Sequence, residues 1–298
     1  MIQFSGKTQK EYIKQVMLKL SIAIAEYNAL PSAFVVFRGF EKFIPVAASL
    51  GYEGVELALK SVSEINTDKL DRWLNDAGIT VSCISTGQVF ADTGFMFTDA
   101  NKNRRKELIF IFKQMIDLAS IFGQFVNIGR VRGSLPENDH GESQKRFIGM
   151  ATELCIYAKQ RGVTLILEPV NRYEINFVNT LEQGVALLEL VNESNFKLMP
   201  DVFHMNIEDP SIDGELKKHI NHLAYIHLAD SNRLAPGQGH INFESIFAGL
   251  REVNYSGWCS LEILPLPEPI IAAKQAIVFL EPFIKAYNEQ EKLIIHGK

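Results

Sequence analysis

The sequence predicts a single-domain (β/α)8 barrel, the α/β fold known as a TIM barrel. Short β-rich apolar runs alternate with longer helical patterns from about residue 18 to the end of the chain, and eight such runs can be counted. No linker rich in serine, glycine or proline interrupts this alternation. A chain of 298 residues also has the usual length of one such barrel.

The eight expected strands are almost continuous in apolar residues, as parallel strands covered by helices on the outside usually are. They span residues 18–24, 52–59, 79–85, 124–129, 163–169, 196–202, 223–229 and 257–263. The segments between them carry apolar residues at helical spacing, for example ELIFIFKQMIDLASIFG, which ends at a C-cap glycine, Gly123. An open doubly wound sheet fits the same alternation. Such a sheet usually has a glycine-rich phosphate turn after its first strand, where this chain has AEYNALPSAF.

The two ends of the chain extend the expected barrel. Residues 1–16 precede the first strand, and Met17 stands directly before it, so we expect an N-terminal extension (1–16) and a barrel domain (17–298). A last helix at about 268–290 is expected to close the barrel against the first strand.

Composition narrows the class of protein. A hydrophobic share of 47% is ordinary for a globular protein, and a net charge of −5 is unlike the basic face of nucleic-acid-binding proteins. We therefore expect a small-molecule partner and no nucleic acid. No run approaches about 18 uninterrupted apolar residues and the first residues are polar, which predicts no membrane association and a cytoplasmic location. The three cysteines (Cys83, Cys155 and Cys259) lie in apolar runs and are expected to be buried free thiols.

Ionisable residues close four consecutive expected strands. VTLILEP brings Glu168, FKLMPDV brings Asp201, LAYIHLA brings His227 and GWCSLEI brings Glu262. Each alone is explained as a helix cap, an ion-pair partner or a core histidine. Together, three carboxylates at the carboxyl-terminal rim of a barrel would repel one another unless a cation neutralised them.

The sequence therefore predicts one divalent metal ion at this rim. Three carboxylates and one imidazole form an oxygen-rich site, which favours Mn²⁺, Co²⁺ or Mg²⁺, although Zn²⁺ competes by intrinsic affinity. Mn²⁺ is the first choice.

Several longer motifs carry a family resemblance. TGQVFADTG, NIGRVRG, LEPVNRYE, DVFHMNIED, HLADSNRLAPGQGH and SLEI resemble the xylose-isomerase-like sugar isomerase and epimerase superfamily, in particular its ketose 3-epimerase branch and most of all the 5-keto-L-gluconate epimerases. The similarity runs from about Met17 to Pro267. It implies that Glu168, Asp201, His227 and Glu262 bind the metal, and that the two glutamates among them also form the acid–base pair.

The resemblance also implies substrate contacts from Glu174, His204 and Arg233. Arg132 and Arg233 follow expected strands on the same rim, and a guanidinium pairs well with a carboxylate, which favours a keto sugar acid as substrate. The run after the third strand, which contains Gln88, is expected to cover the sugar.

The expected activity is epimerisation of a keto sugar or keto sugar acid, such as 5-keto-L-gluconate or a tagaturonate. Proton transfer would pass through a metal-bound cis-enediolate, with two carboxylates as base and acid. A D-tagatose or D-psicose type 3-epimerase and a hydroxypyruvate-type isomerase remain alternatives, with a non-catalytic sugar-binding barrel as a more distant one. A metal-cluster nuclease needs further histidines on strands two to four, which end in Glu56, Ser85 and Gly129. Relatives of this kind are commonly dimers or tetramers, so we expect a homo-oligomer.

Overall fold

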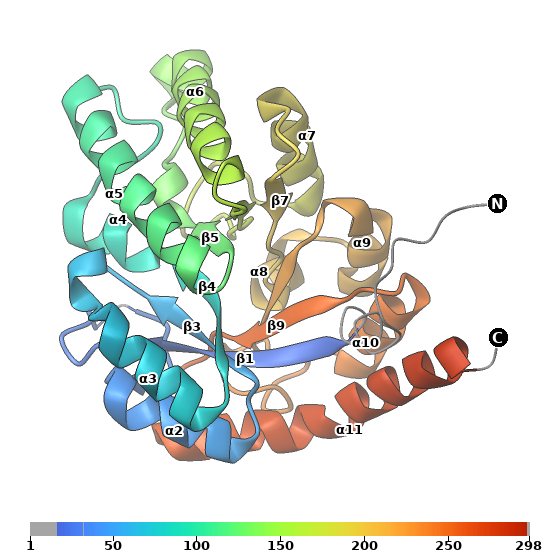
Figure 1. The fold of residues 1–298 in the computed structure, drawn as a ribbon. Helices are drawn as coiled ribbons and strands as arrows, with labels where there is room; N and C mark the ends of the chain where they lie inside the picture. The colour runs from blue at the N-terminus through green and yellow to red at the C-terminus, as the bar shows by residue number, and fades with distance from the viewer. Residues whose placement is uncertain (1–16, 32, 297–298) are drawn as a thin grey trace, which may run out of the picture.

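Parallel strands form the centre of the computed structural model, which describes residues 17–31 and 33–296 (Figure 1). Eight of them form the barrel, and a two-residue strand, β2, pairs with the carboxyl end of β1. Their bounds are β1 Leu18–Ala25, β2 Phe37–Arg38, β3 Gly54–Ala58, β4 Thr80–Ser85, β5 Phe125–Ile128, β6 Thr164–Leu167, β7 Phe196–Leu198, β8 Tyr225–Leu228 and β9 Gly257–Leu261. Each expected strand corresponds to one of the eight, and β2 was not expected.

The strand order shows that the sheet curves into a nearly closed barrel. Neighbouring strands follow the order β7, β6, β5, β4, β3, β1, β9, β8, and every pair is parallel. Between the two outer members, isolated parallel bridges join Leu198 to Leu223 and Asp201 to His227. The prediction of a (β/α)8 barrel is confirmed, and the open doubly wound alternative is wrong.

Helices surround the strands on the outside (Figure 1). Their bounds are α2 Phe40–Leu50, α3 Thr67–Ala77, α4 Gly87–Thr93, α5 Lys102–Ile121, α6 His140–Lys159, α7 Leu181–Val191, α8 Val202–Glu208, α9 Ile212–Lys218, α10 Phe243–Glu252 and α11 Pro269–His296. Several begin at a side-chain cap, for example Asn66 on the backbone N–H of Lys69 and Thr180 on that of Gln183. None of the helices among the described residues combines the length and the apolar character that crossing a bilayer requires.

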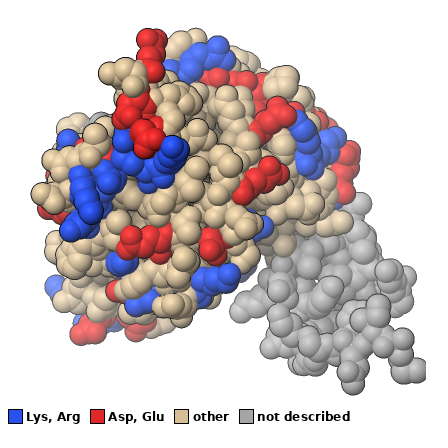
Figure 2. All heavy atoms as spheres, turned by 90° about the horizontal axis from the view of Figure 1, so that it is seen from above, with Lys and Arg blue, Asp and Glu red and all other residues tan. Residues whose placement is uncertain are grey.

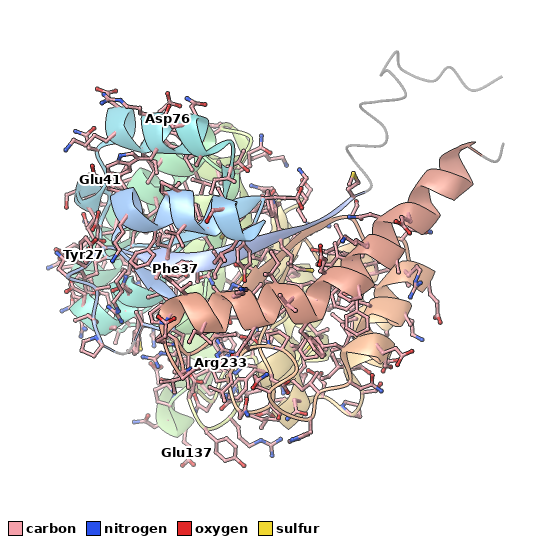
Figure 3. The ribbon with its side chains drawn as sticks, turned by 90° about the horizontal axis from the view of Figure 1, so that it is seen from below. Tyr27, Phe37, Glu41, Asp76, Glu137 and Arg233 are labelled. Carbon is pink, nitrogen blue, oxygen red and sulfur yellow. The ribbon has the colours of Figure 1, made fainter. Side chains whose placement is uncertain are left out.

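The long last helix, α11, crosses the barrel beside α2 and reaches the first strand (Figure 3). Asn288 on α11 accepts a hydrogen bond from the backbone N–H of Leu18 at 3.1 Å and donates one to its carbonyl oxygen at 3.3 Å. The expected closure of the barrel by a C-terminal helix is therefore confirmed. The expected extension at residues 1–16 lies outside the described residues.

Burial agrees with the expected core. The strands are buried on both faces, and Cys83, Cys155 and Cys259 are buried free thiols, as predicted. The predicted C-cap Gly123 follows α5 with φ +98°, a conformation that favours glycine, and an added Cβ would lie 3.0 Å from the carbonyl oxygen of Val81. The turn after the helix thus depends on that glycine.

Candidate active site

The four predicted ligands converge at the carboxyl ends of four neighbouring strands. Glu168 follows β6, Asp201 caps α8 after β7, His227 lies within β8 and Glu262 follows β9. One ligand atom from each lies within 4.8 Å of the others, and among the described residues this is the one group of three or more such side chains placed to hold a metal. The structure thus brings together all four residues that the sequence analysis selected.

His227 shows which atom would face an ion. Its Nε2 lies 2.9 and 3.1 Å from the two carboxylate oxygens of Glu56, to which it donates. Its Nδ1 is buried and has no hydrogen-bond partner among the described residues. Carboxylate oxygens of Glu168, Asp201 and Glu262 lie 3.5, 3.9 and 3.6 Å from this Nδ1. An unpartnered ring nitrogen that faces three carboxylates fits a divalent cation.

Local structure holds two of the three carboxylates in place. The Oδ1 atom of Asp201 accepts the backbone N–H of Phe203 at 2.9 Å, as an N-cap does. Asn127, within β5, donates its side-chain amide to Glu168 at 3.5 Å. Gly129 leaves room for this glutamate, because an added Cβ would lie 3.1 Å from its Oε2 atom.

Burial and neighbouring charges strongly shift the pKa values of the carboxyl groups in the site. Burial raises the pKa of Glu262 to about 8, and the charges of Glu168 and Asp201 act in the same direction against Arg233 and His227. Burial opposes ionisation of Asp201 as well, but Arg233 and the two imidazoles outweigh it and lower that pKa to about 2. Like-charged carboxylates in a buried site need a cation to ionise together. Perturbed groups of this kind are typical of functional sites.

Arg233 supplies one positive charge to the same group. Its guanidinium forks between Asp201 and Glu262 through one nitrogen each, while its Nε is buried without a partner among the described residues. The rings of Phe34 and Phe203 lie 5.2 and 4.8 Å from its guanidinium carbon. Arg233 therefore lies directly beside the predicted metal ligands, in the loop between β8 and α10.

The loop that carries Arg233 is ordered by Asp230. This buried carboxylate accepts backbone N–H groups from Ser231, Gly237 and Ile241 at 2.7 to 3.1 Å. Arg233 itself has φ +62°, and its N–H donates to the carbonyl oxygen of Asp230 at 2.8 Å. The fold thus fixes the backbone of Arg233 before any substrate arrives.

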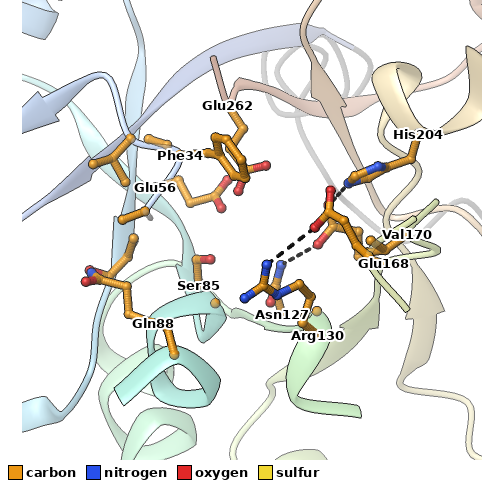
Figure 4. A pocket seen from close by; sticks show the side chains of 18 of the residues that line it. Phe34, Glu56, Ser85, Gln88, Asn127, Arg130, Glu168, Val170, His204 and Glu262 are labelled. Carbon is orange, nitrogen blue, oxygen red and sulfur yellow. Dashed lines mark hydrogen bonds and ion pairs between the residues drawn. The ribbon is translucent and has the colours of Figure 1, made fainter. Parts of the chain in front are cut away.

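A pocket of about 710 Å³, counted with its open mouth, lies over these residues (Figure 4). Its wall combines apolar side chains with Glu56, Asn127, Glu168, His204, Arg233 and Glu262. An apolar wall with a few convergent polar groups is typical of small-molecule sites. Glu56 and Asn127 are functional candidates to which the sequence assigned no role. Glu56 lies in the middle of β3 and not at its end, and a single polar residue inside an apolar strand gives no signal until the strands are paired.

Two predicted substrate contacts line the pocket in a connected arrangement. Asn171 donates to the Nδ1 atom of His204 at 2.8 Å and to Glu174 at 3.2 Å, while its own oxygen accepts the backbone N–H of Tyr173. Burial lowers the pKa of His204, although Asp201 acts in the opposite direction. The neutral imidazole therefore presents an Nε2–H donor, 3.9 Å from oxygens of Glu168 and Asp201.

Glu174 does not pair with Arg172, the nearest arginine in the sequence. Arg172 pairs with Glu208 at 2.8 Å, and Glu174 lies 3.5 Å from Arg130, whose guanidinium also lies over the ring of Phe90. Arg130 and Glu174 both line the pocket. Arg130 therefore lies where the sequence analysis placed Arg132.

Arg132 does not line the pocket. It is fully buried, and its guanidinium donates to the backbone carbonyls of Gly129, Glu168, Phe177 and Val178 at 2.6 to 3.1 Å. Burial lowers its pKa to about 10, against the charges of Glu168 and Glu174. The expected substrate contact is thus corrected to a structural role behind Glu168, because all of these donors are taken by the backbone.

Gln88 lines the pocket, but the backbone occupies its amide. Its oxygen accepts the N–H of Leu30 at 3.0 Å, and its nitrogen donates to the carbonyl of Ala58 at 2.6 Å. The segment expected to be a covering loop forms the short helix α4, which contains this residue. Gln88 therefore connects the loops after β1 and β3, and a direct bond to substrate stays a prediction.

Charged residues of both signs are interspersed on the molecular face shown in Figure 2. Lysine and arginine lie next to aspartate and glutamate there, without a uniformly basic surface. The expectations of no nucleic-acid partner and of a homo-oligomer stay predictions.

Fold and site define a class of protein: a parallel βα barrel with one carboxylate-rich group placed to hold a metal ion at the carboxyl ends of its strands. The chain belongs to the xylose isomerase-like TIM barrel family, whose model matches residues 44–282. A D-psicose 3-epimerase of Enterocloster bolteae is 26% identical over 237 residues, which cover 76% of this chain and 77% of the relative. A 3-dehydro-D-guloside 4-epimerase of Escherichia coli is 32% identical over 105 residues, 35% of this chain and 40% of the relative.

The fold is also shared with solved structures. A D-allulose 3-epimerase from Methylomonas sp., in complex with D-allulose, superposes with a TM-score of 0.77 at 22% identity, covering 89% of this chain and 97% of the other. The relatives are epimerases, which are isomerases, so the predicted family and enzyme class are confirmed.

Proposed function

We propose that the protein is a metal-dependent epimerase of keto sugars, in which Glu168 and Glu262 exchange a proton with a carbon next to the substrate ketone. The observation that carries the proposal is the convergence of His227 Nδ1 and three carboxylates, two of which, Glu168 and Glu262, line the pocket. Relatives that act at carbon 3 or carbon 4 of a sugar support the same reaction type.

A divalent ion held by Glu168, Asp201, His227 and Glu262 would act as a Lewis acid toward the ketone and stabilise charge that develops on its oxygen. Mn²⁺ is the proposed ion because three of the four ligands are carboxylates. The protein itself supplies two carboxylates that come from β6 and β9, on different sides of the pocket (Figure 4). One removes the proton and the other returns one to the opposite face of the carbon, which inverts its configuration.

The remaining pocket residues are proposed to orient the sugar. The Nε2–H of His204 and the carboxylate of Glu174 suit substrate hydroxyls, and Arg233 suits an oxygen beside the metal site. These assignments place hydrogen-bonding groups around a wall that includes Phe34, Val35 and Ala58. Such a pocket binds polar groups at a few fixed points.

The finer proposal is a keto sugar acid such as 5-keto-L-gluconate. Two guanidinium groups line the pocket, those of Arg130 and Arg233. The terminal nitrogens of Arg233 already donate to Asp201 and Glu262, so Arg130 is the one that offers paired donors to a substrate carboxylate. A neutral D-tagatose or D-psicose type substrate is the alternative. Comparable kcat/KM values for neutral ketoses and for keto-hexonates would rule out the sugar acid as the preferred substrate.

The direct test is solvent isotope exchange. The protein is incubated in D₂O with Mn²⁺ and a panel of ketoses and keto-hexonates, the metal is chelated, and proton NMR is recorded. We expect deuterium to enter one carbon next to the ketone while the epimer appears. Deuterium at carbon 1 with formation of an aldose would instead identify an aldose–ketose isomerase, and the absence of exchange with every substrate would contradict the proposal.

Substitutions test the two proton carriers. Glu168→Gln and Glu262→Gln are expected to lower turnover at least about 100-fold at saturating Mn²⁺, because an amide can neither accept nor return the proton. Asp201→Asn is expected mainly to weaken Mn²⁺ binding. Glu252→Gln, on the exposed end of α10, is the matched control and should retain wild-type turnover. Near wild-type activity in Glu262→Gln would refute the two-carboxylate mechanism.

A further inference from the structure

A chain of buried hydrogen bonds continues from His227 into the barrel interior. It consists of Ser21 on β1, Glu56 on β3, Ser82 on β4, and Tyr225 and His227 on β8, and we call it the barrel-centre network. All five side chains have 0% exposure. Tyr225 and His227 are two residues apart on one strand, so both point to the interior of the barrel.

The contacts converge on the Tyr225 hydroxyl. This hydroxyl lies 3.0 Å from Glu56 Oε2, 3.0 Å from Ser21 Oγ and 2.7 Å from Ser82 Oγ. A phenol has one proton and accepts through its oxygen, and a carboxylate only accepts. With Glu56 as a carboxylate, Tyr225 donates to Glu56 and both serine hydroxyls donate to Tyr225. Every polar atom of the phenol is then satisfied.

The direction of these bonds determines the orientation of His227. Glu56 accepts from Tyr225 on one side and from His227 Nε2–H on the other, so the proton of the imidazole stays on Nε2. Nδ1 then faces the three carboxylates, where a bound ion would replace its proton and take its lone pair. The Tyr225 ring also contacts the imidazole edge-on, with ring centroids 5.8 Å apart, and limits its rotation.

We propose that Tyr225 is a positioning residue for the metal centre, which acts by holding Glu56 and, through it, the metal-binding form of His227. The inference rests on the proposed metal-dependent function, since it concerns the same site. Outer hydrogen-bond partners of a metal-ligating histidine typically change metal affinity by about 10-fold to 100-fold. Loss of the Tyr225 hydroxyl leaves Glu56 with His227 as its one remaining donor in the network, so both side chains gain freedom to turn away.

The test is Mn²⁺ binding to Tyr225→Phe, measured by titration calorimetry without substrate. We expect Kd to rise at least about tenfold relative to the wild type. The Mn²⁺ concentration for half-maximal epimerase activity should rise by the same factor, while kcat at saturating Mn²⁺ stays within about threefold. Tyr52→Phe is the matched control: its buried hydroxyl donates to the carbonyl of Ala273 at 2.8 Å, outside the network, and its loss should leave Kd unchanged.

A Kd for Tyr225→Phe within twofold of the wild-type value would overturn the proposal. Should Tyr225→Phe fail to fold, Glu56→Gln replaces it, with an expected loss of Mn²⁺ affinity at least as large; wild-type affinity in that variant would likewise overturn the inference. Failure of the wild type to bind Mn²⁺ would refute the proposed metal centre itself, and so is distinguishable from failure of the network alone.

Discussion

At the scale of single residues, burial and the charge of Arg233 give the carboxyl groups of the site different pKa values. Asp201 is held ionised by that guanidinium, whereas burial keeps Glu262 protonated at neutral pH when no ion is bound. Binding of a cation must therefore displace a proton from Glu262. Metal affinity and pH are coupled through this residue.

We accordingly expect Mn²⁺ affinity to rise with pH. Below the pKa of about 8 of Glu262, each bound ion releases a proton from this group, and the raised pKa of His227 adds a second proton that leaves the ring when the ion binds, so Kd should fall at least about tenfold per pH unit between pH 6 and 8. Calorimetry at several pH values, and in buffers of different ionisation enthalpy, measures both quantities. A Kd that is constant across this range would show that Glu262 is already ionised in the metal-free protein.

Arg132 offers a second test at this scale, because its two interpretations predict different losses. Arg132→Gln should destabilise the protein by roughly 3 kcal/mol or more, since several buried carbonyls lose their donors. Activity should fall equally for neutral and acidic substrates. Thermal denaturation and kcat/KM on both substrate classes measure this. Unchanged stability with a loss confined to keto acids would restore the substrate contact that the sequence predicted.

The same residues show how far sequence reasoning reached. Glu168, Asp201, His227 and Glu262 were predictable, because each closes an apolar strand and barrel topology brings successive strand ends together. Glu56 and Tyr225 were not, because they lie inside strands and acquire a role only when β3 and β8 face each other across the barrel. Arg132 and Arg130 are two residues apart, and their opposite directions depend on the short helical turn at Arg130–Arg132.

At the scale of elements, the strands were predicted better than the segments after them. The strand expected at 196–202 ends at Leu198, because Pro200 has no N–H to donate to a ladder and Asp201 begins α8. The run after β4 was expected to be a loop and forms α4, in which the Gln88 side chain binds the backbone of two other segments. Long-range contacts of this kind leave no periodic pattern in the sequence.

The end of α8 contains an unfavourable carboxyl group that predicts a stabilising substitution. Asp209 accepts the N–H of Leu181 at 3.4 Å through one oxygen, while the other is buried without a partner among the described residues. Burial raises its pKa from 3.8 to about 6. The folded protein therefore binds more protons than the unfolded chain between these values, and Asp209 makes folding less favourable as pH rises from about 4 to 6.

Asp209→Asn should remove this cost. Because the carboxyl group is only half-buried, solvent screening limits the gain to about 1 kcal/mol. The gain in melting temperature over the wild type should be absent near pH 4, grow up to pH 6 and remain constant above. Calorimetric melting curves at pH 4, 5, 6 and 7 measure it. A gain of the same size at pH 4 would assign the effect to something other than ionisation.

At the scale of the whole molecule, alternation of strands and helices was enough to predict the barrel, while its closure depends on specific contacts. The carboxyl ends of β7 and β8 meet through isolated bridges, one of which joins the proposed ligands Asp201 and His227. On the other side of the barrel, α11 returns to β1. The site therefore lies at the junction of β7 and β8, where isolated bridges replace a regular ladder. The positions of the proposed ligands thus also depend on the contacts that close the barrel between α11 and β1.

Asn288→Ala tests the closure between α11 and β1. The substitution removes both bonds to Leu18 and leaves the backbone N–H and carbonyl of a fully buried residue without these partners, so we expect a loss of about 1 to 3 kcal/mol. Asn75→Ala on the exposed face of α3 is the matched control, because it has the same gain in helix propensity but loses one exposed bond to Asp71. Denaturant unfolding of both variants measures the difference. Equal stability would mean that packing of α11, and not these two bonds, closes the barrel.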